Sequence, residues 1–400
     1  MVYLHPENAL ASTGGAISGP TVRSENCYFT SPPEARGATV VAMSGGVDSS
    51  VAAALLSREG HHVVGVTLRL WSDGAGGPKA TGPGQRCTAI DDAQVVAERL
   101  GIPHVVLDCG PVFDRHVAQY FVAAYRRGET PNPCVPCNAW LKFGELLRAA
   151  RDWGAAALAT GHYARVEYHG ATRRHRLYRA ADRRKDQSYF LYALGQDQLA
   201  AARFPLGLLA KAETRRLARD FGLPVAEKAD SQQVCFAAGD YRAYLRERLG
   251  AALTPGTVRD VDGAARGRHA GLPFYTVGQR HGLGLGNSRP LYVVELNPTT
   301  NEVIVGEDSD LWVRELEVEA LNLIAVDRLS APTRVRAKIR YAHEPQPATA
   351  TPLSADRLRL TFDEPQRAVA PGQAAVLYDL ADPDVVVGGG TIRRPERDTV

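Results

Sequence analysis

The 400-residue sequence is poor in the features that mark secreted and membrane proteins. Six cysteines are too few for a disulfide scaffold. No run of about 18 or more apolar residues occurs, which argues against a transmembrane helix. The start includes Glu7 and Asn8 and has no continuous apolar segment, so it does not resemble a secretory signal. These absences predict a cytoplasmic protein with no membrane partner, in which paired cysteines serve catalysis or bind a metal.

A strong excess of charge is also missing. The chain has 47 Lys and Arg against 44 Asp and Glu, a formal net charge of +3. This balance permits a nucleic-acid partner without indicating one. Basic residues do cluster at 173–176 and 183–185, but either cluster by itself is typical of a solvated surface.

The pattern of apolar residues predicts several domains. Residues 1–36 are rich in Ser, Thr, Gly and Pro and are expected to be disordered. Over residues 37–237 strand-like and helix-like segments alternate, which predicts an α/β domain with a parallel sheet. The expected strands are 39–43, 63–68, 104–107 and 156–160; the expected helices are 47–59, 91–100, 112–127 and 138–153; a Gly- and Pro-rich loop is expected at 72–86.

After residue 237 the helical signal fades. Short β-branched segments separated by turn residues occur instead, at 291–296, 302–306, 333–340, 357–362 and 374–378. They predict an all-β region of one or two small barrels, divided into residues 238–305 and 306–396.

A candidate phosphate site lies where the first strand meets the first helix. The segment Ser44-Gly45-Gly46-Val47-Asp48-Ser49-Ser50, here called the phosphate loop, has glycines that let the backbone approach an anion. Unpaired N–H groups at a helix start favour phosphate. Asp48 is unfavourable there unless it acts through Mg²⁺ or caps the helix. The alternative is a plain strand–turn–helix junction, since the loop lacks the Gly-Lys-Ser/Thr ending of a Walker A motif.

The phosphate loop resembles the PP-loop of the ATP pyrophosphatase superfamily. Members of that superfamily split ATP between the α and β phosphates and adenylate a substrate oxygen. Their substrates differ widely, so the resemblance implies the activation chemistry and not the target.

Three cysteines suggest thiol chemistry. Cys134 and Cys137 follow two prolines, which are predicted to delay the next helix until about residue 137. Cys137 would then lie at a helix N-terminus, where the dipole lowers a thiol pKa. Half of a zinc site, or a thioredoxin-like redox pair, are the alternatives. Cys235 alone would be a buried apolar residue; with the upstream pair it suggests a second sulfur for thiol or persulfide chemistry.

With these blocks in order, the chain resembles the bacterial tRNA-uridine 2-sulfurtransferases, the 2-thiouridylase MnmA family. The resemblance covers about residues 39 to 393. The matching blocks are 43–50, 65–71, 130–133, 137–138 with 142–143, 159–165, 185–191, 230–236, 275–280, 340–341 and 371–373.

The resemblance implies ATP-dependent 2-thiolation of the wobble uridine of tRNA. The uridine is flipped into the site, its C2 oxygen is adenylated, Cys235 carries a persulfide, and Cys137 is the nucleophile. The two cysteines close a transient disulfide as product leaves. ATP, with Mg²⁺ and no metal held by protein groups alone, is expected on Ala42, Met43, Ser44, Gly45, Gly46, Val47, Asp48, Ser49, Leu68 and Gly161.

The resemblance also implies tRNA contacts and partners. The expected tRNA contacts are Asn132, Pro133, Cys134, His162, Lys185, Asp186, Gln187, Arg340, Tyr341 and Gln373. Cys134 stands where many members have Asp, and could compete as a thiol; Cys137 is preferred because Cys-Asn-x-x-x-Lys-Phe continues from it. Lys185 suits a phosphate contact, and Tyr341 could stack on a base or be a surface tyrosine. Expected partners are tRNAs for Lys, Glu and Gln and a cysteine desulfurase or sulfur-relay protein.

Two other functions stay open from the residues. One is a different PP-loop enzyme that adenylates a small metabolite. The other is an RNA-binding module with a relic nucleotide site.

Overall fold

The computed structural model describes residues 22–24, 27–29, 34–70, 88–230, 234–237, 240–286 and 289–394. The loop predicted at 72–86 lies outside these residues. Within the segment expected to be disordered, two short strands are present, β1 (Val22–Ser24) and β2 (Cys27–Phe29). That expectation was wrong for these strands, because the free edge of strand β5 offers a pairing partner that β2 uses.

A parallel sheet forms the centre of the first half of the chain. Its strands run in the order β5-β4-β3-β6-β9, and all neighbouring pairs among these five are parallel. This confirms the predicted α/β domain. The bounds are β3 (Thr39–Ala42), β4 (Val63–Arg69), β5 (His104–Asp108), β6 (Ala157–Thr160) and β9 (Ala202–Arg203), with helices α1 (Val47–Arg58) and α2 (Thr88–Leu100).

Two long helical passages connect the strands. The first comprises α3 (Gly110–Phe113), η1 (Asp114–Ala118) and α4 (Gln119–Arg126); the second comprises α5 (Cys134–Pro136), η2 (Cys137–Leu146) and α6 (Leu147–Asp152). The helix η2 is a π-helix, and Gln198 stabilises its turns. Gln198 Nε2 donates to the carbonyl oxygens of Ala139 (3.0 Å) and Phe143 (2.8 Å).

The second passage begins earlier than predicted. Pro133 has helical angles (φ −68°, ψ −18°), and the N–H of Cys137 donates to its carbonyl oxygen. The expectation that the prolines delay the helix until about residue 137 was wrong, because proline is compatible with a first helical turn. Cys134, and not Cys137, therefore begins the helix.

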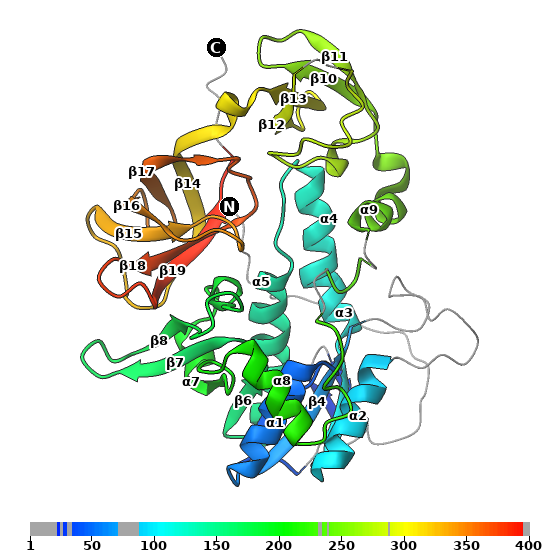
Figure 1. Ribbon diagram of the computed structural model, residues 1–400, viewed down its shortest axis with the longest axis vertical. Helices are drawn as coiled ribbons and strands as arrows, with labels where there is room; N and C mark the ends of the chain where they lie inside the picture. Colours follow the sequence, from blue (N-terminus) through cyan, green and yellow to red (C-terminus); the bar gives the residue numbers. More distant parts are fainter. Residues whose placement is uncertain are drawn as a thin grey trace.

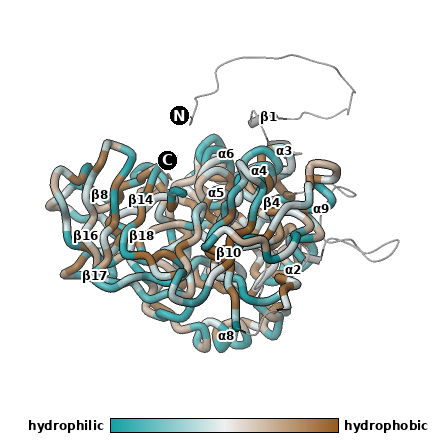
Figure 2. Tube along the Cα trace, turned by 90° about the horizontal axis from the view of Figure 1, so that it is seen from above, coloured by the Kyte–Doolittle hydropathy of each residue, from teal (hydrophilic) through white to brown (hydrophobic). Residues whose placement is uncertain are grey.

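The rest of the α/β domain comprises a hairpin and short helices. They are β7 (Ala164–His169), β8 (Arg174–Arg179), η3 (Ser188–Phe190), α7 (Gln196–Ala201) and α8 (Lys211–Asp220). Strand β8 also pairs with β19 of the C-terminal region, so the hairpin joins the two. Helix α8 is hydrophilic and lies at the periphery (Figure 2).

The middle region is a four-stranded sheet in the order β11-β10-β13-β12. Its elements are α9 (Tyr241–Leu249), η4 (Gly250–Ala252), β10 (Gly256–Asp260), β11 (Ala265–His269), η5 (Leu272–Phe274), β12 (Tyr292–Asn297) and β13 (Glu302–Gly306). The sequence did not predict α9. Its buried face has only Tyr244, Leu245 and Leu249, too short a pattern to stand out among arginines.

The C-terminal region is a closed barrel of six strands. They are β14 (Trp312–Leu323), β15 (Thr333–Lys338), β16 (Gln346–Pro352), β17 (Leu358–Arg367), β18 (Ala374–Asp379) and β19 (Val385–Ile392), preceded by η6 (Asp308–Leu311). Pairing of β14 with β19 closes the barrel. The predicted β-rich regions are thus confirmed.

Figure 1 shows how the three regions are arranged. The barrel lies to one side of the α/β domain, and α4 extends from that domain toward the four-stranded sheet and α9. None of the helices in the described ranges is long and apolar enough to cross a membrane.

Candidate functional site

The phosphate loop connects β3 to α1 and has a shape that only glycine allows. Gly45 has φ +68°, and a Cβ there would lie 2.2 Å from the carbonyl oxygen of Ala89. Gly161 follows β6, and a Cβ on it would lie 2.5 Å from the backbone nitrogen of Ser49. The loop is thus enclosed by the ends of two neighbouring strands, where parallel sheets bind ligands.

Hydrogen bonds within the loop leave the start of α1 open. Ser49 Oγ accepts from the N–H of Ser44 (3.1 Å) and donates to the carbonyl oxygen of Gly46 (3.3 Å). Gly46 is the N-cap of α1, and no described side chain caps the first N–H groups. These groups and the helix dipole suit a phosphate. Of the other residues expected to contact ATP, Met43 and Val47 are buried. Ala42 and Leu68 are half-buried and lie at the ends of neighbouring strands.

Asp48 is neutralised by a cation. Its Oδ1 accepts hydrogen bonds from Lys211 Nζ (2.6 Å) and from the hydroxyl of Tyr163 (3.0 Å). Lys211 Nζ lies 2.8 Å from a carboxylate oxygen of Asp230 as well. The carboxylate that looked unfavourable beside a phosphate is therefore part of an ion-pair network, which the sequence did not reveal.

Asp230 lies at the start of the segment that leads to Cys235 and is surrounded by three cationic side chains. Its carboxylate is paired with Lys185 (2.8 Å), Lys211 (2.8 Å) and Arg215 (2.8 Å). Burial by itself would raise the pKa of Asp230, but hydrogen bonds from Lys185 and Lys211 outweigh it and lower the pKa to about 2.

The thiols of Cys134, Cys137 and Cys235 lie close together. The charges of Cys137 and Cys134 each act on the pKa of Cys235, and the ammonium of Lys142 acts on all three thiols. Water reaches Cys134 and Cys235, although protein surrounds both on most sides. All three thiols are free of disulfides in this structure. The fold thus brings together residues that are far apart in the chain.

Burial raises the pKa of each thiol, and Lys142 only partly offsets it. The pKa of Cys235 is raised to about 12 by burial and by the neighbouring thiols. The pKa of Cys137 is likewise raised by burial. The expectation that a helix N-terminus lowers the Cys137 pKa was wrong, because Cys137 is half-buried one turn inside the helix and desolvation of its thiol raises the pKa. Lys142 is fixed by Asn138, whose Oδ1 accepts from Nζ (3.0 Å).

His162 links the cysteines to the phosphate loop. It directly follows Gly161, and its Nδ1 lies 2.7 Å from Thr160 Oγ1. Burial, and then the charge of Lys142, place the His162 pKa well below its usual value, so the ring is neutral near pH 7. The phosphate loop, His162, Lys142 and the thiols are consecutive neighbours in one site.

The C-terminal barrel holds the segment that precedes Cys134. Gln373 Nε2 donates to the carbonyl oxygen of Thr130 (2.7 Å), and the N–H of Thr130 donates to the carbonyl oxygen of Pro371 (2.7 Å). Gly372 (φ +87°) is needed there, since a Cβ would lie 2.8 Å from Glu129 Cβ. Close to Cys134, Asn132 Oδ1 accepts from the Cys134 N–H (3.2 Å).

The barrel also contributes Tyr341 to the site. Its ring centroid lies 4.5 Å from that of Phe190, and the residue is 39% exposed. Burial chiefly raises the Tyr341 pKa, and the negative charges of Asp186, Asp182 and Cys134 add to this in decreasing order. Arg340 donates to the carbonyl oxygen of Arg367.

The segment 185–187, expected to contact tRNA, differs in exposure from residue to residue. Asp186 is buried and accepts hydrogen bonds from Arg179 Nε (3.2 Å) and from the N–H and hydroxyl of Ser188 (3.1 and 3.0 Å). Its side chain therefore shapes the segment from inside. Gln187 is half-buried and accepts from the N–H of Tyr163 (3.0 Å), whereas Lys185 is paired with Asp230.

Several functional side chains had no recognisable signal in the sequence. Lys211 lies 163 residues from Asp48, and Lys228, which donates to the carbonyl oxygen of Gly45 (2.9 Å), lies still farther along. Lys142 was part of a matching block without an assigned role. Among the described residues, no group of three or more His, Cys, Asp or Glu side chains is placed to hold a metal ion.

A glycine-rich phosphate loop at the end of the first parallel strand, with thiols beside it, defines a PP-loop enzyme with an α/β nucleotide-binding domain. Family models match in the same order: tRNA methyl transferase HUP domain over residues 38–239, tRNA methyl transferase PRC-barrel domain over 242–307, and aminomethyltransferase beta-barrel domain over 313–392.

Curated relatives are similar over nearly their whole length. The tRNA-specific 2-thiouridylase MnmA of Moorella thermoacetica is 50% identical over 356 residues, which cover 88% of this chain and 98% of that protein. MnmA 1 of Caldanaerobacter subterraneus subsp. tengcongensis is 46% identical, covering 91% and 100%. MnmA of Pelotomaculum thermopropionicum is 47% identical, covering 88% and 96%. The chain belongs to the family of tRNA-specific 2-thiouridylases, which are sulfurtransferases.

The phosphate loop predicts a contrast between its two glycines. Gly45→Ala should lower the free energy of unfolding by more than about 1 kcal/mol, because a left-handed backbone disfavours a side chain and Ala89 blocks the Cβ. Gly46→Ala should cost less than about 0.5 kcal/mol, since its Cβ meets only Ser44 Oγ at 3.5 Å. Urea titration without ligand measures both. Equal costs would contradict this account of the loop.

The Asp230 network predicts a pH-dependent stability. A depressed pKa stabilises the fold above the unfolded-state value near 4, and this contribution is lost as pH falls toward about 2. Asp230→Asn should therefore destabilise the protein by about 2 kcal/mol at pH 7, and the difference from wild type should shrink below pH 4. Urea titrations at pH 7, 4 and 3 test this. A difference that is constant with pH would assign the loss to packing.

Lys142 predicts the reactivity of the thiols. Because it lowers raised thiol pKa values, Lys142→Met should slow alkylation of Cys137 and Cys235 at pH 8, by about tenfold for each unit of pKa. Lys142→Arg keeps the charge and should retain most of the rate. Peptide-resolved mass spectrometry of iodoacetamide labelling measures this across pH. Identical rates in the Met variant would exclude an electrostatic role for Lys142.

Proposed function

We propose that the enzyme uses ATP to replace the C2 oxygen of the tRNA wobble uridine with sulfur. The observation that supports this most is the single site formed by the phosphate loop, His162, Lys142 and the thiols of Cys137 and Cys235. Nucleotide activation and sulfur delivery can take place there on one base.

ATP is proposed to bind with its phosphates on the N–H groups of the phosphate loop and the hydroxyls of Ser44 and Ser49. The space that Gly45 and Gly161 leave clear of side chains fits this role. Mg²⁺ is proposed to arrive on the phosphates, since Asp48 is already paired with Lys211. The uridine C2 oxygen attacks the α-phosphorus, and pyrophosphate leaves.

Sulfur transfer then follows with a balanced exchange of bonds. A donor protein first leaves a persulfide on Cys235. Its terminal sulfur attacks C2 of the adenylated uridine, and AMP leaves with the original oxygen. The Cys137 thiolate attacks Sγ of Cys235, which breaks the bond to the transferred sulfur and leaves that sulfur on the base. The resulting Cys137–Cys235 disulfide needs two electrons from an external thiol reductant.

Cys134 is assigned a position beside the base and not a role in sulfur chemistry. It lies at the helix start with Asn132 and Pro133, the segment proposed to contact the target base, where an acidic residue is common in the family. Its thiol is close to Cys235, which makes the distinction from Cys137 an experimental question.

The three regions are proposed to share the tRNA. Residues 37–237 hold ATP and the cysteines, 238–305 form the middle region, and 306–396 contribute Arg340, Tyr341 and Gln373. Tyr341 is half-exposed next to the thiols, as a stacking residue needs to be. The proposed substrates are tRNAs for Lys, Glu and Gln, and the proposed sulfur donor is a cysteine desulfurase or relay protein in the cytoplasm.

Methyl transfer, which two of the family-model descriptions name, is the competing reaction. It has no use for two thiols near one nucleotide loop in the way that sulfur transfer does. Mass spectrometry of the modified nucleoside separates the two, because sulfur replaces an oxygen whereas a methyl group adds carbon.

The cysteine roles are tested by single variants. Cys235→Ser and Cys137→Ala should each abolish formation of 2-thiouridine in tRNA, whereas tRNA-dependent release of pyrophosphate should persist. Cys134→Ala is the matched control and should keep thiolation within a few-fold of wild type. Thiolation is measured by nucleoside mass spectrometry with a tRNA-Lys transcript, ATP, and a cysteine desulfurase with free cysteine as the source of persulfide sulfur.

Three outcomes would contradict the proposal. Unchanged thiolation with Cys235→Ser would remove the persulfide role. Activity in Cys137→Ala but not in Cys134→Ala would reassign the nucleophile. Pyrophosphate release driven by a small acid without tRNA would indicate a different PP-loop enzyme.

A further inference from the structure

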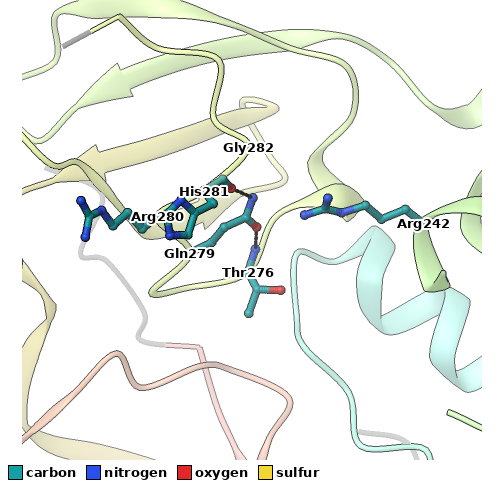
Figure 3. Close-up of a pocket in the computed structure, with 6 residues that line it drawn as sticks. All are labelled: Arg242, Thr276, Gln279, Arg280, His281 and Gly282. Carbon is teal, nitrogen blue, oxygen red and sulfur yellow. Dashed lines mark hydrogen bonds between the residues drawn. The ribbon is translucent and has the colours of Figure 1, made fainter. Parts of the chain in front are cut away.

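A basic recess lies in the middle region, away from the cysteines. It is lined by Arg242 of α9 and by the turn after η5, with Thr276, Gln279, Arg280, His281 and Gly282 (Figure 3). Arg242 points toward Thr276 and Gln279 from the opposite wall, whereas Arg280 extends to the other side of the turn. The turn belongs to a block of sequence, 275–280, to which no role has been assigned.

The turn is rigid. Gln279 Oε1 accepts from the N–H of Thr276 (3.2 Å), and its Nε2 donates to the carbonyl oxygen of His281 (2.9 Å). Backbone hydrogen bonds join Gly278 and Gln279 to Val293 of β12 (2.7 and 2.9 Å). Both ends of the Gln279 amide are thus bonded inside the turn, Thr276 is half-buried, and Arg280 and His281 are exposed.

The arginines of the recess differ from most of their neighbours. Arg248, Arg259, Arg266 and Arg289 are each paired with a carboxylate. Arg242 and Arg280 make no ion pair with a described residue. The Nε of Arg242 is buried and has no hydrogen-bond partner among the described residues. An anionic ligand in the recess would give this donor the acceptor that it lacks.

We propose that this recess binds a backbone phosphate of the same tRNA whose uridine enters the cysteine site. The inference rests on the proposed function. The guanidinium group matches phosphate oxygens in geometry and charge, and a hydroxyl such as that of Thr276 is a common additional donor. Phosphate contacts fix the position of an RNA without reading its sequence.

The position of the recess suits a tRNA bound at the cysteines. Tyr241, beside Arg242, stacks on Tyr125 at the end of α4, with ring centroids 5.3 Å apart. From Tyr125 the chain leads through nine residues to Cys134, at most about 30 Å. Because each nucleotide carries a phosphate, a tRNA with one base at the cysteines has phosphates over that whole distance. The segment 125–134 therefore connects the two contacts.

The experiment compares arginines that differ only in place. Arg242→Met removes a charge from the recess; Arg268→Met removes one from β11, where Arg268 is exposed, makes no ion pair with a described residue and lies outside the recess. Binding of an unmodified tRNA-Lys transcript is measured by fluorescence anisotropy at several salt concentrations. Arg242→Met should weaken binding about five- to tenfold and lower the salt slope by about 0.7–0.9, the loss of one phosphate contact. Arg268→Met should change neither.

Further readouts separate a tRNA contact from other effects. Thr276→Val, an isosteric and uncharged change, should weaken binding about two- to threefold with the salt slope unchanged. In thiolation assays Arg242→Met should raise KM for tRNA and leave kcat unchanged. Equal effects of Arg242→Met and Arg268→Met would overturn the proposal. So would loss of inorganic phosphate binding in Arg242→Met with tRNA affinity unchanged, which would identify a small-anion site.

Direct binding keeps the two proposals distinguishable. If wild-type protein binds tRNA with the expected Arg242 dependence but forms no 2-thiouridine, the recess stands and the proposed reaction fails. If wild type thiolates tRNA and Arg242→Met binds as well as wild type, the recess is excluded and the reaction stands.

Discussion

The ammonium of Lys211 holds together the two halves of the site. It lies between Asp48, in the phosphate loop and the first turn of α1, and Asp230, at the start of the segment that leads to Cys235. A carboxylate beside a phosphate site is unfavourable unless a cation accompanies it, and a buried cation needs more than one acceptor. One lysine meets both needs. The phosphate loop and the segment that leads to Cys235 are therefore positioned by a shared network of ion pairs.

A second constraint comes from outside the α/β domain. The turn at Gly372 and Gln373 of the barrel binds the backbone of Thr130, just before the Cys134 segment. Tyr341 reaches the same place from another barrel turn. The helix η2, which begins at Cys137, is stabilised by Gln198. The side-chain amide of Gln198 donates hydrogen bonds to two carbonyl groups in its π-helical turns. The barrel is thus a structural part of the site.

Features formed by residues close in the sequence were predictable, whereas contacts between residues far apart in the sequence were not. The phosphate loop could be found because its glycines and serines are consecutive at a strand–helix junction. The pairing of Cys137 with Cys235 came only from family resemblance, since no spacing rule connects residues 98 positions apart. Strands of the barrel showed β-branched segments, but closure by β14 and β19 depends on non-local pairing. The start of the helix that carries Cys134 and Cys137 was predicted too late. Proline is tolerated in the first turn of a helix and disrupts only later turns.

The raised pKa values of the Cys137 and Cys235 thiols lower the reactivity of these residues toward oxidants. Disulfide formation and oxidation proceed through the thiolate. Burial keeps Cys137 and Cys235 mostly protonated near neutral pH, although they are near neighbours. The ammonium of Lys142 opposes this effect, because its positive charge favours the thiolate form of both residues. Burial of the thiols thus slows the thiolate-dependent oxidation of these two neighbouring cysteines.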